Sequence, residues 1–144
     1  MQIGVETSRA VENKRIFVVD DDEIIRAALQ FMLHDENETH EVAGLDLAFA
    51  KAVDSKPDLI LLAESIVRGT GIGVLTQIRE QIAGAKILVV VEPAMDEIAR
   101  QCLSAGAHGI LAKPLTIESV REKVDILLGR RAGFAIPLIV LKTP

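Results

Sequence analysis

The chain has 144 residues with 16 Lys or Arg and 21 Asp or Glu, so its formal net charge is -5. This length indicates a single domain, and the acidic balance argues against a broad basic surface that would bind nucleic acid or anionic lipid. Aromatic residues make up only 3% of the chain, which argues against stacking platforms for single-stranded nucleic acid. The sequence has neither a signal-peptide pattern nor an apolar run of about 20 residues, so we expect a cytoplasmic protein without a membrane segment.

Short apolar runs alternate with amphipathic stretches along the chain. The apolar runs predict strands at residues 15–19, 40–44, 58–63, 86–91 and 109–112. Helical periodicity and capping residues predict helices over residues 22–32, 45–53, 72–81, 95–105 and 116–128. A loop is predicted at residues 68–71. Five strands that alternate with five helices imply right-handed crossovers and an α/β fold with a parallel sheet.

The chain divides into three segments. Residues 1–13 are polar, and we expect them to form a flexible N-terminal segment. Residues 14–129 hold the alternating strands and helices and form the predicted domain. Residues 130–144 form an apolar tail in which Pro137 favours an edge position. An exposed apolar tail is a candidate for covering its own domain or for pairing with another chain.

Charged side chains follow several of the predicted strands, at the edge where open parallel sheets bind ligands. Asp20, Asp21 and Asp22 follow the first strand, and Lys113 follows the fifth. Adjacent carboxylates can bind a hard cation such as Mg²⁺, and a lysine can neutralise a phosphoryl group. Acids at this place also suit the first turn of the next helix, so a structural role for Asp21 and Asp22 stays open.

Several short motifs occur together in one order. They are residues 17–21 (FVVDD), 57–62 (PDLILL), 71–75 (GIGVL), 105–109 (AGAHG) and 113–114 (KP). In this order the motifs resemble the receiver domain of bacterial response regulators, a family that includes the chemotaxis response regulator. The resemblance implies a flavodoxin-like, doubly wound parallel sheet of five strands in the order 2-1-3-4-5, with five helices. It also implies a site where an aspartate accepts a phosphoryl group from a histidine kinase, with Mg²⁺.

The positions that the resemblance assigns to phosphoryl transfer hold apolar residues in this chain. In the family the acceptor aspartate ends the third strand. Counting forward along residues 57–62 and back from Gly71 places Ala63 at that position. The position of the threonine or serine that binds the phosphoryl group is Val91, and that of the aromatic switch residue is Ile110. The resemblance therefore implies a receiver whose acceptor and switch residues are lost.

Three polar residues of the family pattern remain, namely Asp20, Asp21 and Lys113. The methyl group of Ala63 cannot act as the nucleophile of phosphoryl transfer. An alanine in place of the family's aspartate also removes one cation ligand. We therefore expect Mg²⁺ to bind Asp20 and Asp21 only weakly and no cofactor to be required. Lys113 is expected to pair with Asp20 or Asp21, and Glu92 is a further candidate for a local ion pair with this lysine.

We therefore expect a pseudo-receiver, a signalling module of two-component phosphorelay systems that acts through phosphorylation-independent protein–protein interaction and is not an enzyme. One alternative is a phosphorylatable response regulator with a non-standard acceptor such as Glu64. Because side chains alternate along a strand, Glu64 is expected to point away from the acid pair. A second alternative is a small-ligand-binding flavodoxin-like domain that uses the vacated site or the glycine-rich residues 69–73.

The expected partners are other signalling proteins, either a histidine kinase or an output protein, and a second copy of the chain is a further candidate. Direct binding to nucleic acid or to a membrane is not expected. By family analogy, the contact surface lies on the fourth helix, fifth strand and fifth helix, which carry Met95, Arg100, Gln101, Ile110 and Glu122.

Overall fold

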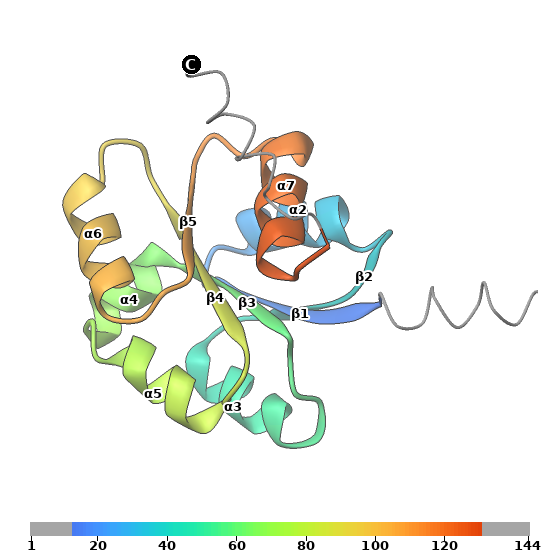
Figure 1. Ribbon diagram of the computed structural model, residues 1–144, viewed down its shortest axis with the longest axis horizontal. Coiled ribbons are helices and arrows are strands. Elements are labelled where there is room, and N and C mark those ends of the chain that lie inside the picture. Colours follow the sequence, from blue (N-terminus) through green and yellow to red (C-terminus); the bar gives the residue numbers. More distant parts are fainter. Residues whose placement is uncertain (1–12, 131–144) are drawn as a thin grey trace, which may run out of the picture.

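The computed structural model describes residues 13–130 of the chain. The predicted flexible segment 1–13 and apolar tail 130–144 lie outside the described residues, apart from residues 13 and 130. Between them, helices cover both faces of one sheet (Figure 1). No helix in this range is long and apolar enough to cross a membrane.

Five parallel strands form the sheet, and they are hydrogen-bonded in the order β2-β1-β3-β4-β5. The strands are β1 (Lys14–Val19), β2 (Asn37–Val42), β3 (Leu59–Ala63), β4 (Lys86–Val91) and β5 (Gly109–Ala112). This order confirms the predicted flavodoxin-like, doubly wound fold. β2 begins earlier than predicted, because its polar first residues pair with the start of β1 at the edge of the sheet, where one neighbour is missing.

Six helices are present among the described residues, so the prediction of five was wrong by one. They are α2 (Glu23–Leu33), α3 (Leu45–Asp54), α4 (Glu64–Thr70), α5 (Val74–Gln81), α6 (Asp96–Ser104) and α7 (Ile117–Leu127). The additional helix is α4, which replaces part of the loop predicted at residues 68–71. It forms because Val67 packs in the core and Glu64 pairs with Arg68 one turn later. Gly71, with φ of 105°, ends the helix.

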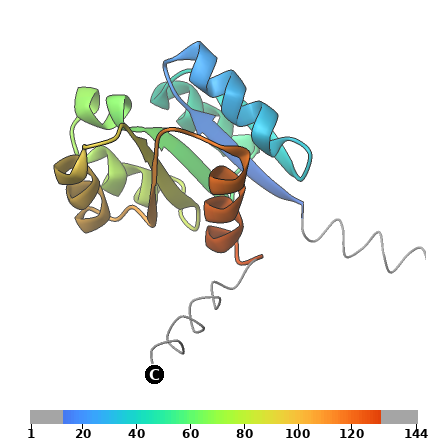
Figure 2. The same cartoon turned by 90° about the horizontal axis from the view of Figure 1, so that it is seen from above.

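The sheet separates two layers of apolar side chains. One face packs against α2 and α7, which contribute Leu29, Leu33, Val120 and Val124. The other face packs against α3, α4, α5 and α6. Figure 1 shows α2 and α7 on one side of the sheet and α3 and α5 on the other, and Figure 2 shows the twisted strands from a second direction. Burial on both faces explains the uninterrupted apolar sequence of β3 and β4.

Two helix starts next to the carboxyl edge are capped as the sequence predicts. Asp22 Oδ1 accepts hydrogen bonds from the backbone N–H groups of Ile24 and Ile25 at the start of α2. Thr116 Oγ1 accepts a hydrogen bond from the backbone N–H of Ser119 at the start of α7. These caps anchor the loops that follow β1 and β5.

Candidate functional site

The residues that the sequence marks as a candidate site meet at the carboxyl edge of the sheet, where the parallel strands end. Asp20 and Asp21 follow β1, Ala63 ends β3, Val91 ends β4 and Lys113 follows β5. β1 pairs in parallel with β3, β3 with β4 and β4 with β5, so the chain leaves the sheet at the same edge in each case. The topology therefore brings together residues that are up to about ninety positions apart in the sequence.

Asp20 is buried, with 4% of its surface exposed, and local hydrogen bonds hold it in place. Its Oδ1 accepts a hydrogen bond from the backbone N–H of Asp22 at 2.8 Å, and its carbonyl oxygen accepts one from Arg26 Nη1 at 2.8 Å. Burial raises the pKa of the Asp20 carboxyl, and the neighbouring charge of Asp21 acts in the same direction. The hydrogen bond from Asp22 and the charge of Lys113 oppose this shift. The surroundings of Asp20 therefore make ionisation of its carboxyl group less favourable.

The next two acids make different contacts. Asp21 is exposed, and its Oδ1 accepts a hydrogen bond from Ser65 Oγ at 3.1 Å. This contact ties the loop after β1 to the first turn of α4. Asp22 caps α2, with its Oδ1 2.9 Å from the backbone nitrogen of Ile24. The structural role that the sequence leaves open therefore applies to Asp22.

Ala63 is the last residue of β3 and the N-cap of α4, and 6% of its surface is exposed. The next residue, Glu64, is 4% exposed, and its carboxylate is paired with Arg68. The Glu64 charge contributes, after burial, to the raised pKa of the Cys102 thiol on α6. The Glu64 carboxylate therefore pairs with Arg68 and lies close enough to α6 for its charge to act on Cys102.

The prediction that Lys113 pairs with Asp20 or Asp21 is wrong. Lys113 Nζ donates a hydrogen bond to Glu92 Oε2 at 2.7 Å, and within the described range neither Asp20 nor Asp21 forms an ion pair with it. This hydrogen bond is the largest cause of the raised pKa of Lys113, and the Asp20 charge acts on it from farther away. Glu92, the other candidate that the sequence offers, directly follows β4, the strand that pairs with β5, and this places its carboxylate beside Lys113.

Val91 and Ile110 belong to the apolar layer of the sheet. Val91 is 3% exposed at the end of β4, and Ile110 is half-buried. Ile110 packs against the same core cluster as Met95 and Ile98, at the inner side of α6. These two positions carry no hydroxyl group and no aromatic ring, and they join β4 and β5 to α6 by packing alone.

Asp20 and Asp21 are the carboxylates of the receiver pattern that this edge offers to a Mg²⁺ ion. Between residues 13 and 130, no group of three or more His, Cys, Asp or Glu side chains is arranged to hold a metal ion. Asp20 and Asp21 each use one carboxylate oxygen in a hydrogen bond, and Ala63 offers no oxygen on its side chain. Mg²⁺ commonly keeps several waters beside one or two carboxylates, so Asp20 and Asp21 would hold it with water in place of a third carboxylate, and weak binding stays our expectation.

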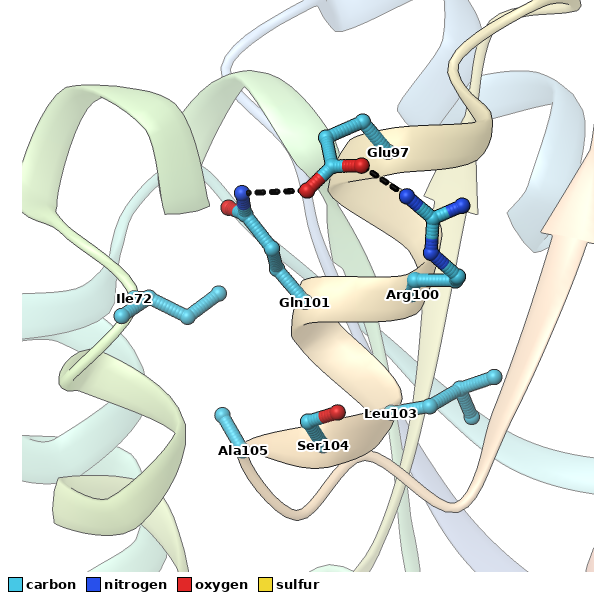
Figure 3. Close-up of a pocket in the computed structure, with 7 residues that line it drawn as sticks. All are labelled: Ile72, Glu97, Arg100, Gln101, Leu103, Ser104 and Ala105. Carbon is cyan, nitrogen blue, oxygen red and sulfur yellow. Dashed lines mark hydrogen bonds and ion pairs between the residues drawn. The ribbon is translucent and has the colours of Figure 1, made fainter.

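A cavity of about 600 Å³ borders the outer side of α6, the helix that the sequence assigns to the contact surface. Figure 3 shows Ile72, from the turn before α5, facing this helix across the cavity. The Glu97 carboxylate binds the side chains of Arg100 and Gln101 on the same helix. Leu103 is 48% exposed at the cavity. This side of α6 therefore combines exposed apolar surface with an ordered polar cluster.

Three parts of the site are not predicted from the sequence. These are the contact of Arg26 with the Asp20 carbonyl, the hydrogen bond from Ser65 to Asp21, and helix α4 itself. A signal for α4 exists, because Glu64 and Arg68 stand four residues apart, at the spacing of a helical ion pair. The hydrogen bond from Ser65 to Asp21 depends on the pairing of β1 with β3, whereas the contact of Arg26 with Asp20 joins α2 to the preceding strand end.

Residues 16–125 match the response regulator receiver domain. The chain belongs to this family. It is 35% identical over 140 residues to the alkaline phosphatase synthesis transcriptional regulatory protein PhoP of Bacillus subtilis, and the aligned region covers 90% of this chain and 54% of PhoP. It is 29% identical over 117 residues to the chemotaxis protein CheY of Halobacterium salinarum, and the aligned region covers 80% of this chain and 97% of CheY. The chain thus spans about half the length of PhoP and nearly all of CheY.

Solved receiver structures share the fold. A response regulator from Thermotoga maritima superposes with a TM-score of 0.73 at 21% identity, over 81% of this chain and 98% of that chain. The receiver domain of NtrX from Brucella abortus gives a TM-score of 0.73 at 26% identity, over 81% and 99%. The beryllofluoride-activated NtrC4 receiver domain dimer gives 0.72 at 23% identity, over 80% and 96%. These structures agree in fold with the family match over residues 16–125, which shows a response regulator receiver domain.

Proposed function

We propose that this receiver domain signals by binding other proteins, without being phosphorylated. The observation that carries the proposal is Ala63, a buried alanine that ends β3, where the receiver pattern places its acceptor aspartate. Phosphoryl transfer needs an in-line nucleophile, and a methyl group has no lone pair to offer. In this proposal the domain is a pseudo-receiver, a non-enzymatic module of a two-component pathway in the cytoplasm, and it requires no cofactor.

The contacts of the remaining polar residues support the proposal. Ser65 binds Asp21, and Glu92 binds Lys113, so both groups have partners within the domain. The positions for sensing a phosphoryl group hold Val91 and Ile110, which pack in the core. A domain with this arrangement has its α6 side held by packing that does not depend on a phosphoryl group.

Glu64 is less well supported as a replacement acceptor. Its carboxylate is buried and paired with Arg68, and its charge acts on Cys102 of α6. A carboxylate in this state is shielded from an incoming phosphoryl donor and is already neutralised by a cation. We infer that Glu64 stabilises α4, the helix that follows Ala63.

The proposed contact surface is formed by α6, β5 and α7. Arg100, Gln101 and Glu122 are exposed on the two helices, and Leu103 adds apolar surface. β5 is an edge strand of the sheet. The partners we propose are a histidine kinase or an output protein. A second copy of this chain is a further candidate, since the NtrC4 receiver domain, which shares the fold, forms a dimer.

An NMR titration with beryllofluoride at a constant concentration of Mg²⁺ tests the phosphorylation-independent mechanism. We expect the backbone amide signals of Asp20, Ala63 and Lys113 to stay in place, because the site has no acceptor carboxylate. A receiver domain with an aspartate at the end of its third strand serves as the positive control. Saturable shifts in the wild-type chain would contradict the proposal. If these shifts disappeared in Glu64→Gln, Glu64 would be the acceptor.

A further inference from the structure

A second group of charged side chains lies at the amino edge of the sheet, opposite the acid pair. It lines a cavity of about 450 Å³ between the end of α5 and the starts of β4 and β5. Arg79 and Glu80 come from α5, Lys86 is the first residue of β4, and His108 directly precedes β5. We call Arg79, Lys86 and His108 the basic pocket. Its volume falls in the range of small-molecule sites, roughly 300–1,000 Å³.

Arg79 differs from the other arginines of the described chain. The other arginines between residues 13 and 130 each have a carboxylate within 4.0 Å, and these are Arg15, Arg26, Arg68, Arg100, Arg121 and Arg130. Arg79 has neither an ion pair nor a hydrogen bond to any described residue, and the same holds for the Lys86 ammonium group. Two cations that line one cavity therefore have no paired carboxylate among the described residues.

The position of Arg79 is supported by close packing against Gly106. A β-carbon at Gly106 would lie 2.7 Å from Arg79 Cδ and 2.8 Å from Arg79 Nη1, so the absence of a side chain at Gly106 makes room for the arginine. Arg79 also lies in the last turn of α5, where a cation suits the helix dipole. The dipole accounts for a cation on α5, but it does not account for Lys86 and His108 on the two neighbouring strands.

His108 is held by two contacts with one residue. Its backbone N–H donates to the Ile87 carbonyl oxygen at 2.8 Å, and its ring Nδ1 accepts a hydrogen bond from the Ile87 N–H at 2.9 Å. The proton of the neutral ring is therefore on Nε2, which leaves one N–H donor for a ligand. Burial lowers the pKa of His108, and the nearby charges of Lys86 and Arg79 lower it further. Both cations thus act on the same ring.

The balance of charge around the cavity is positive. Lys56 approaches from the turn before β3, with its Nζ 3.6 Å from the position of a β-carbon at Gly84, a residue that lines the cavity. Glu80 is the acid among the lining residues, and it forms no ion pair with a described residue. Two cations, Arg79 and Lys86, therefore line the cavity with one carboxylate, and Lys56 adds a positive charge close to Gly84.

We propose that the basic pocket binds a phosphate group through Arg79, Lys86 and His108. The Arg79 guanidinium offers paired N–H donors that match two phosphate oxygens, Lys86 supplies a point charge, and His108 supplies the Nε2–H donor. A doubly charged oxyanion suits the pocket because it compensates more than one cation. Inorganic phosphate and the phosphomonoester of a small metabolite share this chemistry. The site is independent of the carboxyl edge and of the proposed signalling mechanism.

An NMR titration of the full chain with sodium phosphate, at constant ionic strength and with chloride as the reference anion, tests this site. We expect saturable shifts at Arg79, Lys86 and His108. Arg79→Gln is expected to weaken binding by about tenfold or more, since it removes a charge-assisted hydrogen-bond pair. Glu80→Gln is expected to strengthen binding. Arg100→Gln serves as the matched control, because Arg100 is an exposed arginine already paired with Glu97, and it should leave binding unchanged.

A parallel titration with ribose 5-phosphate separates the two sources of the ligand. Tighter binding than that of inorganic phosphate indicates a phosphomonoester, and equal binding indicates that the phosphate group alone is recognised. Both results support the site. The proposal is overturned if the three residues show no saturable shift, if chloride produces the same shifts, or if Arg79→Gln binds phosphate as well as the wild-type chain.

Discussion

The two edges of the sheet carry charge in opposite ways. At the carboxyl edge, polar groups satisfy one another, as Ser65 binds Asp21 and Glu92 binds Lys113. At the amino edge, Arg79 and Lys86 line a cavity without a carboxylate partner in the described chain. The fold alone directs attention to the carboxyl edge, since open parallel sheets bind ligands there. The difference shows that the residues at each edge, and not the fold, decide where charged side chains are left to bind a ligand.

Gly106→Ala gives the largest expected effect and acts on the amino edge. Gly106 has φ of 117°, and a β-carbon there would lie 2.7 Å from Arg79 Cδ. We expect the free energy of unfolding to fall by about 2 kcal/mol, since the backbone conformation is strained for alanine and the arginine must move. Urea denaturation measures this loss, and the phosphate titration should show weaker binding.

Gly73→Ala is the matched control for that variant. Gly73 has a negative φ of -63°, and nothing lies within 4 Å of its β-carbon position. We expect this variant to be as stable as the wild-type chain or more stable by a few tenths of a kcal/mol. Equal losses in both glycine variants would contradict a specific role of Gly106 in placing Arg79.

Ala63→Asp sharpens the comparison at the carboxyl edge. It adds a buried carboxylate near Asp20, whose pKa burial already raises. Without Mg²⁺ we expect the free energy of unfolding to fall by about 1–2 kcal/mol, because an unpaired charge loses its hydration. Added Mg²⁺ should recover this loss, since the variant has a third acidic ligand.

Urea denaturation with and without Mg²⁺ measures the effect of Ala63→Asp. Ala63→Asn is the control, because it has similar volume but no charge, and it should gain little from Mg²⁺. If Mg²⁺ stabilises the wild-type chain as much as the aspartate variant, the carboxyl edge holds a cation without a third carboxylate, and our account of that edge is wrong.

Asp20→Asn tests how much the buried acid destabilises the fold. Burial raises the folded-state pKa of Asp20. The contribution of Asp20 to the free energy of unfolding is therefore most favourable below the ordinary pKa of 3.8 and is lost as pH rises through the folded-state pKa. Asparagine stays neutral and can still accept the hydrogen bond from the Asp22 N–H. We expect the variant to be more stable at pH 7 by up to about 1 kcal/mol, and this gain to vanish at low pH. Urea denaturation at several pH values measures it, and a variant less stable than wild type at pH 7 contradicts the interpretation.

Glu92→Gln is expected to have the smallest effect. The carboxylate of Glu92 is 49% exposed and the Lys113 side chain 25%, so their bond contributes less than about 1 kcal/mol. The pKa of Lys113 is raised, chiefly by this hydrogen bond, so the contribution is present below the ordinary lysine value of 10.5 and is lost as pH rises through the folded-state pKa. Stability curves of the two proteins should therefore converge at alkaline pH. A constant difference across the pH range would show that the charge of Lys113 is not involved.

Much of the fold follows from the sequence because buried parallel strands have a strong pattern. β3 and β4 are apolar along almost their whole length, and the helix caps Asp22 and Thr116 are recognisable residue types at the expected places. The start of β2 is harder to predict, since Asn37 is not typical of a strand and is placed there by pairing with β1. α4 contains Gly69 and β-branched residues that favour helix weakly, and its formation depends on the packing of Val67.

The two candidate sites likewise have parts that the sequence predicts and parts that it does not. The sequence places Asp20, Ala63 and Lys113 at one edge, because strand ends are predictable from apolar runs. It offers Asp20, Asp21 and Glu92 as partners of Lys113 but does not decide among them, and the structure places Lys113 with Glu92. The basic pocket has no sequence signal, because its residues are brought together only by the pairing of β4 with β5 and by the packing of α5.

The central claim is that the domain is not phosphorylated, and intact-mass measurement after incubation with acetyl phosphate and Mg²⁺ tests it most directly. A receiver domain with an aspartate at the end of its third strand, treated in parallel, shows that the conditions support phosphorylation. We predict that the mass of this chain stays unchanged, because Ala63 offers no nucleophile at the end of β3. A stoichiometric, acid-labile gain of one phosphoryl group would contradict the account.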